Sequence, residues 1–173
     1  MSRRSLNPRT LAVTAVMTAI VFVLTSLVRV PTPAKGYIHL GDAGIFFTAL
    51  AFGPWIGAAA GGLGTALADA AGGYPQWAPF SFLIHGLEGW AVGWISRRWP
   101  GMTGLVLSVV VGAIIVVAGY FAAGILLSGI GAAVGELPLN ILQVVGGGVL
   151  GAALFALVRQ AYPPITRFGR RRD

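Results

Sequence analysis

The stretch of sequence that decides the fold lies at residues 103–127 and reads TGLVLSVVVGAIIVVAGYFAAGILL. It contains no charged residue. A helix of about 20 apolar residues is long enough to cross the hydrocarbon core of a membrane, which is roughly 30 Å thick. A surface helix of a soluble protein would instead carry polar residues along one face. The stretch therefore predicts a membrane-spanning helix.

The composition of the whole chain supports this prediction. Of the 173 residues, 56% are hydrophobic and only 10% are charged, whereas an ordinary soluble domain is about 25% charged. The chain has no cysteine, which excludes disulfides, thiol nucleophiles and cysteine-bound metals. Its single lysine, Lys35, is followed by Gly36, so the Gly-Lys-Ser/Thr sequence of a phosphate-binding loop is absent. These counts exclude a soluble globular domain and a P-loop ATPase.

Further apolar runs, separated by glycine, proline and basic residues, predict six helices in all. Their expected positions are about 11–28, 42–52, 55–71, 80–95, 103–127 and 138–158, with a glycine-rich connection before the last. We therefore expect an all-α integral membrane protein, a six transmembrane helix bundle that forms a single domain over residues 1–173. Basic tails are expected at about 1–9 and 160–173. The first run has an alternative interpretation as a signal peptide, but it is long for one and lacks a clear cleavage site.

The basic residues predict how the bundle is oriented. With six spans, both termini lie on one side of the membrane, together with ten basic residues, whereas Arg29 and Lys35 lie on the other. Because cytoplasmic loops carry the excess of Lys and Arg, both termini are expected in the cytoplasm. The net charge of +7 thus reflects membrane topology, and no basic, aromatic-interleaved face points to nucleic acid. The ten residues are Arg3, Arg4, Arg9, Arg97, Arg98, Arg159, Arg167, Arg170, Arg171 and Arg172.

Small residues recur at four-residue spacing, as in Gly57-xxx-Gly61 and Gly89-xxx-Gly93. Such spacing allows helix backbones to approach closely inside a membrane. It predicts a tightly packed bundle.

The few polar residues within or beside the spans are expected in the outer half of the bundle. His85 and Glu88 are three residues apart and share a helix face. Glu136, Asn140 and Gln143 share a face of the last helix. Ionisable groups inside a membrane are costly and therefore functional candidates. Their position favours a pocket that opens to the outside over a continuous pore.

The outer loops are expected to cover this pocket with aromatic rings. These rings, with a few hydrogen-bonding groups, suit a planar heterocyclic ligand. The rings of the two loops belong to Tyr37, His39, Tyr74 and Trp77.

Several of these residues also have a purely structural interpretation. Tyr74 and Trp77 are candidates for interfacial anchors, and Asp42 for a helix N-cap. Glu136 has an alternative role beside a helix N-terminus, with proline in the first helical turn. Asp69, near the end of the third expected helix, is a further polar candidate. Its structural interpretation is a helix-end residue in the wet interface.

The sequence favours transport over catalysis. It contains no H-E-x-x-H motif, no second histidine on the face of His85 and no evident pair of nucleophile and base. We therefore expect no catalytic residue, metal site or cofactor. An intramembrane enzyme is the alternative, and it would need a metal or a turnover that depends on His85.

Six stretches, taken in chain order, resemble the substrate-binding S component of energy-coupling factor (ECF) vitamin transporters. The resemblance is to the riboflavin/hydroxymethylpyrimidine-type branch, and it covers almost the whole chain. The stretches are IHLGDAG at 38–44, GP at 53–54, GGLGTALAD at 61–69, GYPQWAP at 73–79, HGLEG at 85–89 and ELPLNILQ at 136–143.

The resemblance implies a membrane subunit that captures a vitamin or vitamin precursor from outside. Uptake would be driven by ATP through a transmembrane coupling protein and two cytoplasmic ATPases. A hydroxymethylpyrimidine or thiamine-related compound is the first candidate ligand, followed by riboflavin and pyridoxine. His85 stands where lysine is common in that branch, which leaves the ligand open. A stand-alone membrane scaffold or small channel is the alternative function.

The resemblance also implies roles for individual residues. A face of alanines on the first helix, Ala15 and Ala19, matches the surface that binds the coupling protein. The residues expected to bind substrate are Tyr37, His39, Tyr74, Trp77, His85, Glu88, Glu136, Asn140 and Gln143.

Overall fold

The computed structural model describes residues 7–167, and six α-helices dominate it. A short β-hairpin separates the first two helices, and a 3-10 helix follows the last. The elements are α1 (Pro8–Leu27), β1 (Arg29–Pro31), β2 (Tyr37–His39), α2 (Gly41–Phe52), α3 (Pro54–Ala71), α4 (Ala78–Arg98), α5 (Met102–Ser128), α6 (Ile130–Ala161) and η1 (Pro163–Arg167).

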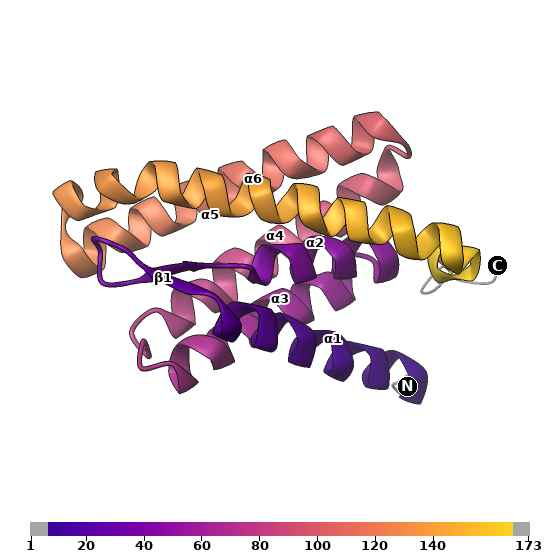
Figure 1. Cartoon of the computed structure of the whole chain (residues 1–173), viewed down its shortest axis with the longest axis horizontal. Coiled ribbons are helices and arrows are strands. Elements are labelled where there is room, and N and C mark those ends of the chain that lie inside the picture. Colours follow the sequence, from indigo (N-terminus) through magenta and orange to yellow (C-terminus); the bar gives the residue numbers. More distant parts are fainter. Residues whose placement is uncertain (1–6, 168–173) are drawn as a thin grey trace, which may run out of the picture.

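The six helices run back and forth along one direction, as Figure 1 shows. One end of the bundle carries the β-hairpin and is called the hairpin end here. The start of α1 and the end of α6 both lie at the opposite end (Figure 1). Arg9, Arg97, Arg98 and Arg159 belong to the helix ends found there, so it is called the basic end.

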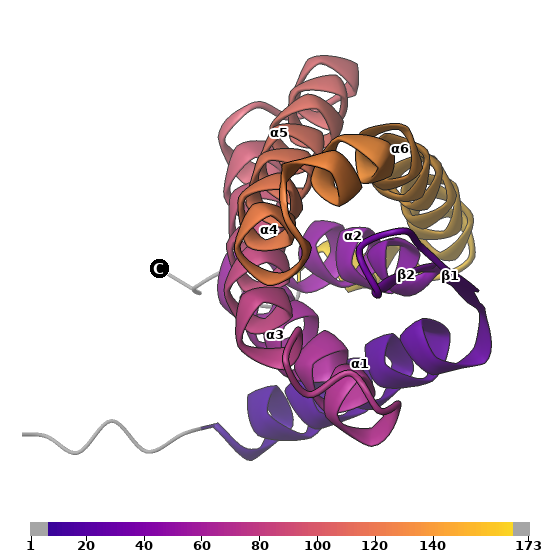
Figure 2. The ribbon, with the colours of Figure 1, turned by 90° about the vertical axis from the view of Figure 1, so that its left-hand side faces the viewer.

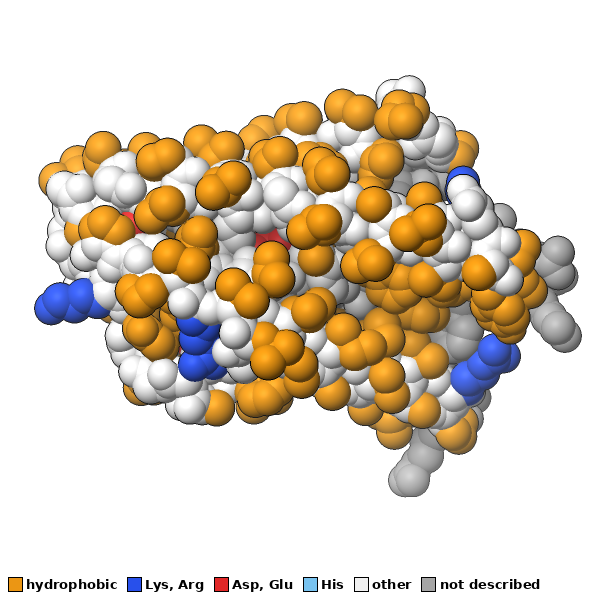
Figure 3. Space-filling view, viewed as in Figure 1, with side chains coloured by type: hydrophobic (Ala, Val, Ile, Leu, Met, Phe, Trp, Pro, Cys, Tyr) orange, Lys and Arg blue, Asp and Glu red, His pale blue; other side chains and the backbone are white. Residues whose placement is uncertain are grey.

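Helix α2 occupies the middle of the bundle, as Figure 2 shows in a view along the long axis of the bundle. Nine of its twelve residues are buried, including Ile45 and Phe46. A helix that is apolar all round is stable only inside a larger apolar structure, which explains this position. The outward surface is also largely hydrophobic, as Figure 3 shows for one face. Such a surface suits contact with lipid.

Three helices, α1, α5 and α6, are long and apolar enough to cross a membrane. The 12-residue α2 is about 18 Å long and is covered by the others.

Helices α3 and α4 pack with their backbones almost in contact. A Cβ atom on Gly57 would lie 2.7 Å from the carbonyl oxygen of Gly89, and one on Gly61 would lie 2.5 Å from that of His85. Both distances are shorter than real Cβ contacts. The expected role of small residues in helix packing is confirmed here. This close packing against α3 also holds in place the α4 face that carries His85.

The predicted helices are confirmed, with one large difference in α6. This helix begins at Ile130 and not near Pro138, and only Gly129, at φ 86°, separates it from α5. The glycine-rich segment before Pro138, which the sequence predicts as a connection, is helical. An apolar packed environment tolerates glycine and proline within a helix. Pro138 lies inside α6. The expectation that Glu136 stands beside a helix N-terminus is therefore wrong, and Asn140 lies about 15 Å along the helix instead of about 3 Å.

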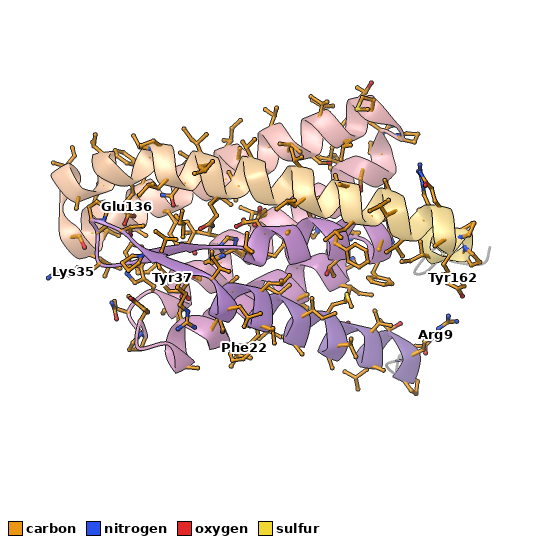
Figure 4. The ribbon with its side chains drawn as sticks, in the orientation of Figure 1. Arg9, Phe22, Lys35, Tyr37, Glu136 and Tyr162 are labelled. Carbon is orange, nitrogen blue, oxygen red and sulfur yellow. The ribbon has the colours of Figure 1, made fainter. Side chains whose placement is uncertain are left out.

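The segment expected as a loop after the first helix contains the hairpin. Arg29 pairs with His39, and Pro31 pairs with Tyr37, in antiparallel register. The hairpin places Tyr37 at the hairpin end of the bundle (Figure 4), and His39 ends β2, two residues before α2 begins.

Candidate functional site

The candidate site is a small cavity at the hairpin end, between the hairpin and helices α3 to α6. In this structure its volume is about 20 Å³, which is room for about one water molecule. Its lining combines aromatic rings with carboxyl, amide and hydroxyl groups. The lining residues are Thr32, Gly36, Tyr37, His39, Asp69, Trp77, Ser81, Tyr120, Glu136, Asn140 and Gln143.

The turn of the hairpin is bonded to α5 and α6 and forms the roof of the cavity. The Glu136 carboxylate accepts hydrogen bonds from the Thr32 hydroxyl and from the backbone N–H of Ala34, the latter at 3.0 Å. The Ser128 hydroxyl donates to the Ala34 carbonyl at 2.8 Å. Figure 4 shows Glu136 on α6 directly beside this turn.

The connection between α3 and α4 holds the same turn from the other side. The indole N–H of Trp77 donates to the carbonyl of Lys35 at 3.2 Å. Trp77 is buried and its ring lies 5.8 Å from that of Tyr120. Trp77 therefore presents its ring, and not its N–H, to the cavity.

One wall is built from a tyrosine and a carboxylate. The Tyr37 hydroxyl donates to Asp69 Oδ1 at 2.6 Å. Burial raises the pKa of Tyr37, and the hydrogen bond to Asp69 and the charge of that carboxylate raise it further. Tyr37 thus remains a protonated donor at physiological pH. The second oxygen of Asp69, Oδ2, is buried without a hydrogen-bond partner.

His39 is positioned by α2 and α6. Its Nδ1 accepts the backbone N–H of Gly41 at 3.1 Å, and its own backbone N–H donates to Gln143 Oε1 at 2.9 Å. Burial lowers the pKa of His39, and electrostatic interaction with His85 and Arg29 lowers it further. A neutral imidazole that accepts at Nδ1 carries its proton on Nε2. His39 therefore offers a donor at Nε2.

A layer of ionisable groups lies directly beneath the cavity. His85 Nδ1 is 2.7 Å from Glu88 Oε2 and 3.6 Å from Asp42 Oδ1, and all three side chains are fully buried. The His85 ring lies 5.4 Å from that of His39 and 5.5 Å from that of Tyr120. Because both of those rings line the cavity, His85 lies directly behind its lining.

Three residues of this region have the composition of a metal site. Donor atoms of His39, Asp42 and His85 all lie within 4.8 Å of one another. The spacing of residues along one helix does not reveal this group, because His39 comes from the hairpin. However, Nδ1 of His39 and Nδ1 of His85 already have hydrogen-bond partners. These bonds are made to the Gly41 N–H and to Glu88, and none joins the three residues to one another.

The structure brings most of the predicted substrate residues to the cavity. Tyr37, His39, Trp77, Glu136, Asn140 and Gln143 line it. His85 and Glu88 lie beneath it. Tyr74 does not line it and packs against the ring of Tyr37 at 4.8 Å.

Asp42 and five lining residues were not predicted to bind substrate. Asp42 does not cap a helix: the N-cap of α2 is Leu40, and both carboxylate oxygens of Asp42 are buried without a hydrogen-bond partner. The signal that marks Asp42 is its charge in an apolar segment, and the same signal marks Asp69. Ser81 stands four residues before His85, which places both on one face of α4. Thr32, Gly36 and Tyr120 carry no comparable signal.

Comparisons with known proteins agree on the class of protein. Residues 5–160 match the family described as ECF-type riboflavin transporter, S component. The chain is 33% identical to the thiamine precursor transporter HmpT of Lactococcus lactis subsp. cremoris (strain MG1363), over 89% of this chain and 90% of HmpT. It is 42% identical to an uncharacterized protein of Pyrococcus woesei, over 84% of this chain and 98% of that protein.

A solved structure has the same fold. It is described as the S component of a bacterial ECF transporter, and it superposes with a TM-score of 0.70 at 19% sequence identity. The match covers 89% of this chain and 97% of the other.

Proposed function

Because this chain belongs to the family of ECF-type riboflavin transporter S components, we propose that it captures a small vitamin precursor outside the cell for ATP-driven uptake. The chain is an integral membrane protein, and its family and fold are those of transporter subunits and not of enzymes. The proposal concerns the ligand, the residues that bind it, the orientation in the membrane and the partners.

The observation that carries the proposal is a set of buried polar atoms with no partner at the cavity. Asp69 Oδ2 and Asn140 Nδ2 belong to lining residues, and His85 Nε2 lies in the layer beneath them. A buried polar atom without a hydrogen bond costs about 1–3 kcal/mol. A bound ligand that supplies these bonds recovers this free energy, whereas a purely structural cluster would leave it unrecovered.

Hydroxymethylpyrimidine, or a related thiamine precursor, is the ligand that we place first. The similarity to HmpT supports it, and an aminopyrimidine offers both donors and acceptors on a flat ring. Riboflavin and pyridoxine follow.

We assign stacking to Trp77 and Tyr37, with Tyr74 as support behind Tyr37. Hydrogen bonding is assigned to the side chains of His39, His85, Asn140 and Gln143, and Glu88 orients His85.

We infer that the bundle has six spans, with the hairpin end outside and both termini in the cytoplasm. The described residues place Arg9, Arg97, Arg98 and Arg159 at the basic end, against Arg29 and Lys35 at the hairpin end. The positive-inside rule supports this orientation. The other basic residues counted in the sequence lie outside the described residues, except that the backbone of Arg167 belongs to η1.

The partners that we propose are a transmembrane coupling protein and two cytoplasmic ATPases. Family membership supports them. Ala15 and Ala19 are both exposed on α1, which is the arrangement that a docking surface of small residues requires.

Binding of hydroxymethylpyrimidine to the purified protein, measured by isothermal titration calorimetry, tests the proposal. Asn140→Ala removes an unpartnered donor of the cavity, and Glu88→Ala releases His85. Each is expected to weaken binding at least tenfold, which corresponds to about 1.4 kcal/mol. Gln160→Ala is the matched control, because Gln160 is an exposed amide near the end of α6 at the basic end.

Wild-type affinity in both variants would place the site elsewhere in the bundle. A protein that binds no vitamin or precursor and does not co-purify with coupling and ATPase subunits would instead be a stand-alone scaffold or channel.

A further inference from the structure

A second cavity lies at the basic end of the bundle, and it is much larger than the one under the hairpin. Its volume is about 440 Å³, which is within the range of about 300–1,000 Å³ that is usual for ligand pockets. Its walls come from the last residues of α2 and α4, the first turn of α5 and the last part of α6. Among the described residues, the two cavities share no lining residue. A ligand bound here is therefore distinct from the vitamin precursor.

The charge of this cavity is positive. Arg97 of α4 and Arg159 of α6 both line it. Guanidinium groups stay charged at physiological pH, and their N–H groups match the oxygen atoms of a phosphate. Within residues 7–167 no acidic residue lines the cavity, because the four carboxyl groups found there lie in or beneath the cavity at the hairpin end. The cavity is therefore complementary to an anion.

The rest of the lining is largely apolar. Leu50 of α2, Leu105 of α5 and Phe155 of α6 contribute to it. Met102 also lines the cavity and is 73% exposed, so the cavity reaches the outer surface of the bundle. A free phosphate has no apolar part to cover these side chains, whereas an amphiphile covers them with its hydrocarbon chain. The lining therefore suits an anionic amphiphile.

Exposed aromatic rings indicate the depth of the cavity in the membrane. Trp94, Trp99 and Tyr162 are exposed near the basic end, and the first two rings meet edge to face at 5.6 Å. Tryptophan and tyrosine are enriched at the level of the lipid headgroups. Trp99 directly precedes Pro100, which lines the cavity. In the proposed orientation this level belongs to the cytoplasmic leaflet, which carries anionic lipids.

We propose that the cavity at the basic end binds an anionic phospholipid, with Arg97 and Arg159 contacting its phosphate and an acyl chain covering the apolar lining. The protein holds both arginines in place. Arg97 donates to the carbonyl of Phe52 at the end of α2, at 2.9 Å, and the Arg159 guanidinium lies 5.7 Å from the centre of the Phe155 ring. A lipid in this position joins the ends of α4 and α6. The proposal concerns a separate cavity and is independent of vitamin capture.

Native mass spectrometry of the purified full-length protein in a mild detergent tests the proposal. The probes are phosphatidylglycerol and phosphatidylcholine with identical acyl chains, so that they differ in net charge and not in hydrocarbon. Phosphatidylglycerol is expected to bind at least tenfold more tightly than phosphatidylcholine. Glycerol 1-phosphate, which has the phosphate but no acyl chain, is expected to leave the bound lipid in place when it is added in excess.

The double variant Arg97→Gln with Arg159→Gln is expected to lose the preference for phosphatidylglycerol. Arg98→Gln is the matched control, because Arg98 removes the same charge at the same end of α4 but lies outside the lining, 5.5 Å from the centre of the Trp99 ring. Arg159→Gln alone gives an independent measurement if the double variant does not fold. It is expected to reduce the preference at least threefold.

A second pair of variants tests the apolar part of the cavity. Ala152 lines it, whereas its neighbour Ala153 is exposed and lies outside the lining. Ala152→Leu fills part of the space and is expected to weaken binding of phosphatidylglycerol at least threefold. Ala153→Leu is expected to bind it as the wild type does.

Equal binding of the two lipids to the wild type would overturn the proposal. Displacement of the lipid by glycerol 1-phosphate would contradict it as well, because the cavity would then be a site for a soluble phosphate. An unchanged lipid preference in the double arginine variant, with loss of co-purification with the coupling protein, would identify the cavity as a protein contact instead. Binding of hydroxymethylpyrimidine, measured in parallel, tests the proposed function alone.

Discussion

At the scale of single residues, His39 shows how this site holds a titratable group in its neutral form. Its Nδ1 accepts a backbone N–H, and its ring is buried against His85. Burial disfavours a proton on this ring, and the positive charge of Arg29 disfavours one further. Burial therefore lowers the pKa of His39 below its ordinary value of 6.5.

This lowered pKa predicts a pH dependence of stability. An unfolded chain takes up a proton on His39 below about pH 6.5, whereas the folded chain takes it up only at lower pH. The contribution of neutral His39 to stability is thus complete above pH 6.5 and declines as the pH falls. We expect the melting temperature of the detergent-solubilised protein to fall between pH 7 and pH 5, and His39→Asn to reduce this fall.

His39→Asn is a suitable comparison because an asparagine oxygen can still accept the Gly41 N–H and does not titrate. Equal losses of melting temperature in the two proteins would assign the pH dependence to another group, such as His85.

The candidate site could be predicted from the sequence where charge or an amide stands out in an apolar helix. Glu136, Asn140 and Gln143 were found in this way, and the cavity contains all three. Tyr120 could not be found, because an aromatic ring in a membrane helix is equally typical of packing. The meeting of His39 with His85 depends on the hairpin, and no local spacing encodes such a contact.

At the scale of elements, the pair α3 and α4 depends on glycine at the points of closest approach. A Cβ on Gly89 would overlap the carbonyl of Gly57, whereas one on Gly86 would lie at an ordinary 3.6 Å from the carbonyl of Ala58. Two glycines three residues apart on α4 thus have opposite tolerance for a side chain.

Gly89→Ala is therefore expected to destabilise the protein by about 1–3 kcal/mol, because the two helices must separate. Gly86→Ala is expected to be neutral or to stabilise it, since alanine favours the helix by about 0.5–1 kcal/mol. Melting temperatures in one detergent give the comparison. A loss of the same size in both variants would mean that the helix, and not the contact with Gly57, is sensitive to the change.

Element boundaries were predictable where apolar runs end at proline or at paired basic residues. Gly53-Pro54 separates α2 from α3, as expected. The start of α6 was not predictable, because Gly131 and Gly135 are typical of loops in water and are accommodated in a helix inside an apolar bundle. The hairpin was missed because its strands are only three residues long.

At the scale of the whole molecule, the candidate site and the proposed docking surface lie on different parts of the bundle. The hairpin end contains the candidate site. The exposed alanines of α1 lie along the side of the bundle and form no part of the cavity lining. Ligand capture and partner docking are therefore separable by substitution.

We expect Ala15→Leu together with Ala19→Leu to reduce co-purification with the coupling and ATPase subunits at least tenfold, because bulky side chains prevent close helix approach. Ligand affinity should remain that of the wild type. Ala153→Leu, an exposed alanine on α6, is the matched control. Normal co-purification of the double variant would place the docking surface on another helix.

The bonded roof of the cavity has a consequence for the timing of capture. A space that holds about one water cannot admit a heterocycle in this conformation, in which Glu136, Ser128 and Trp77 hold the hairpin turn. The site must widen before the ligand is fully bound, so at high ligand concentration the association rate is set by a first-order step of the protein. The same step governs escape. A dilute nutrient that has been captured is then released slowly, and its residence time gives the slower events of transport time to occur.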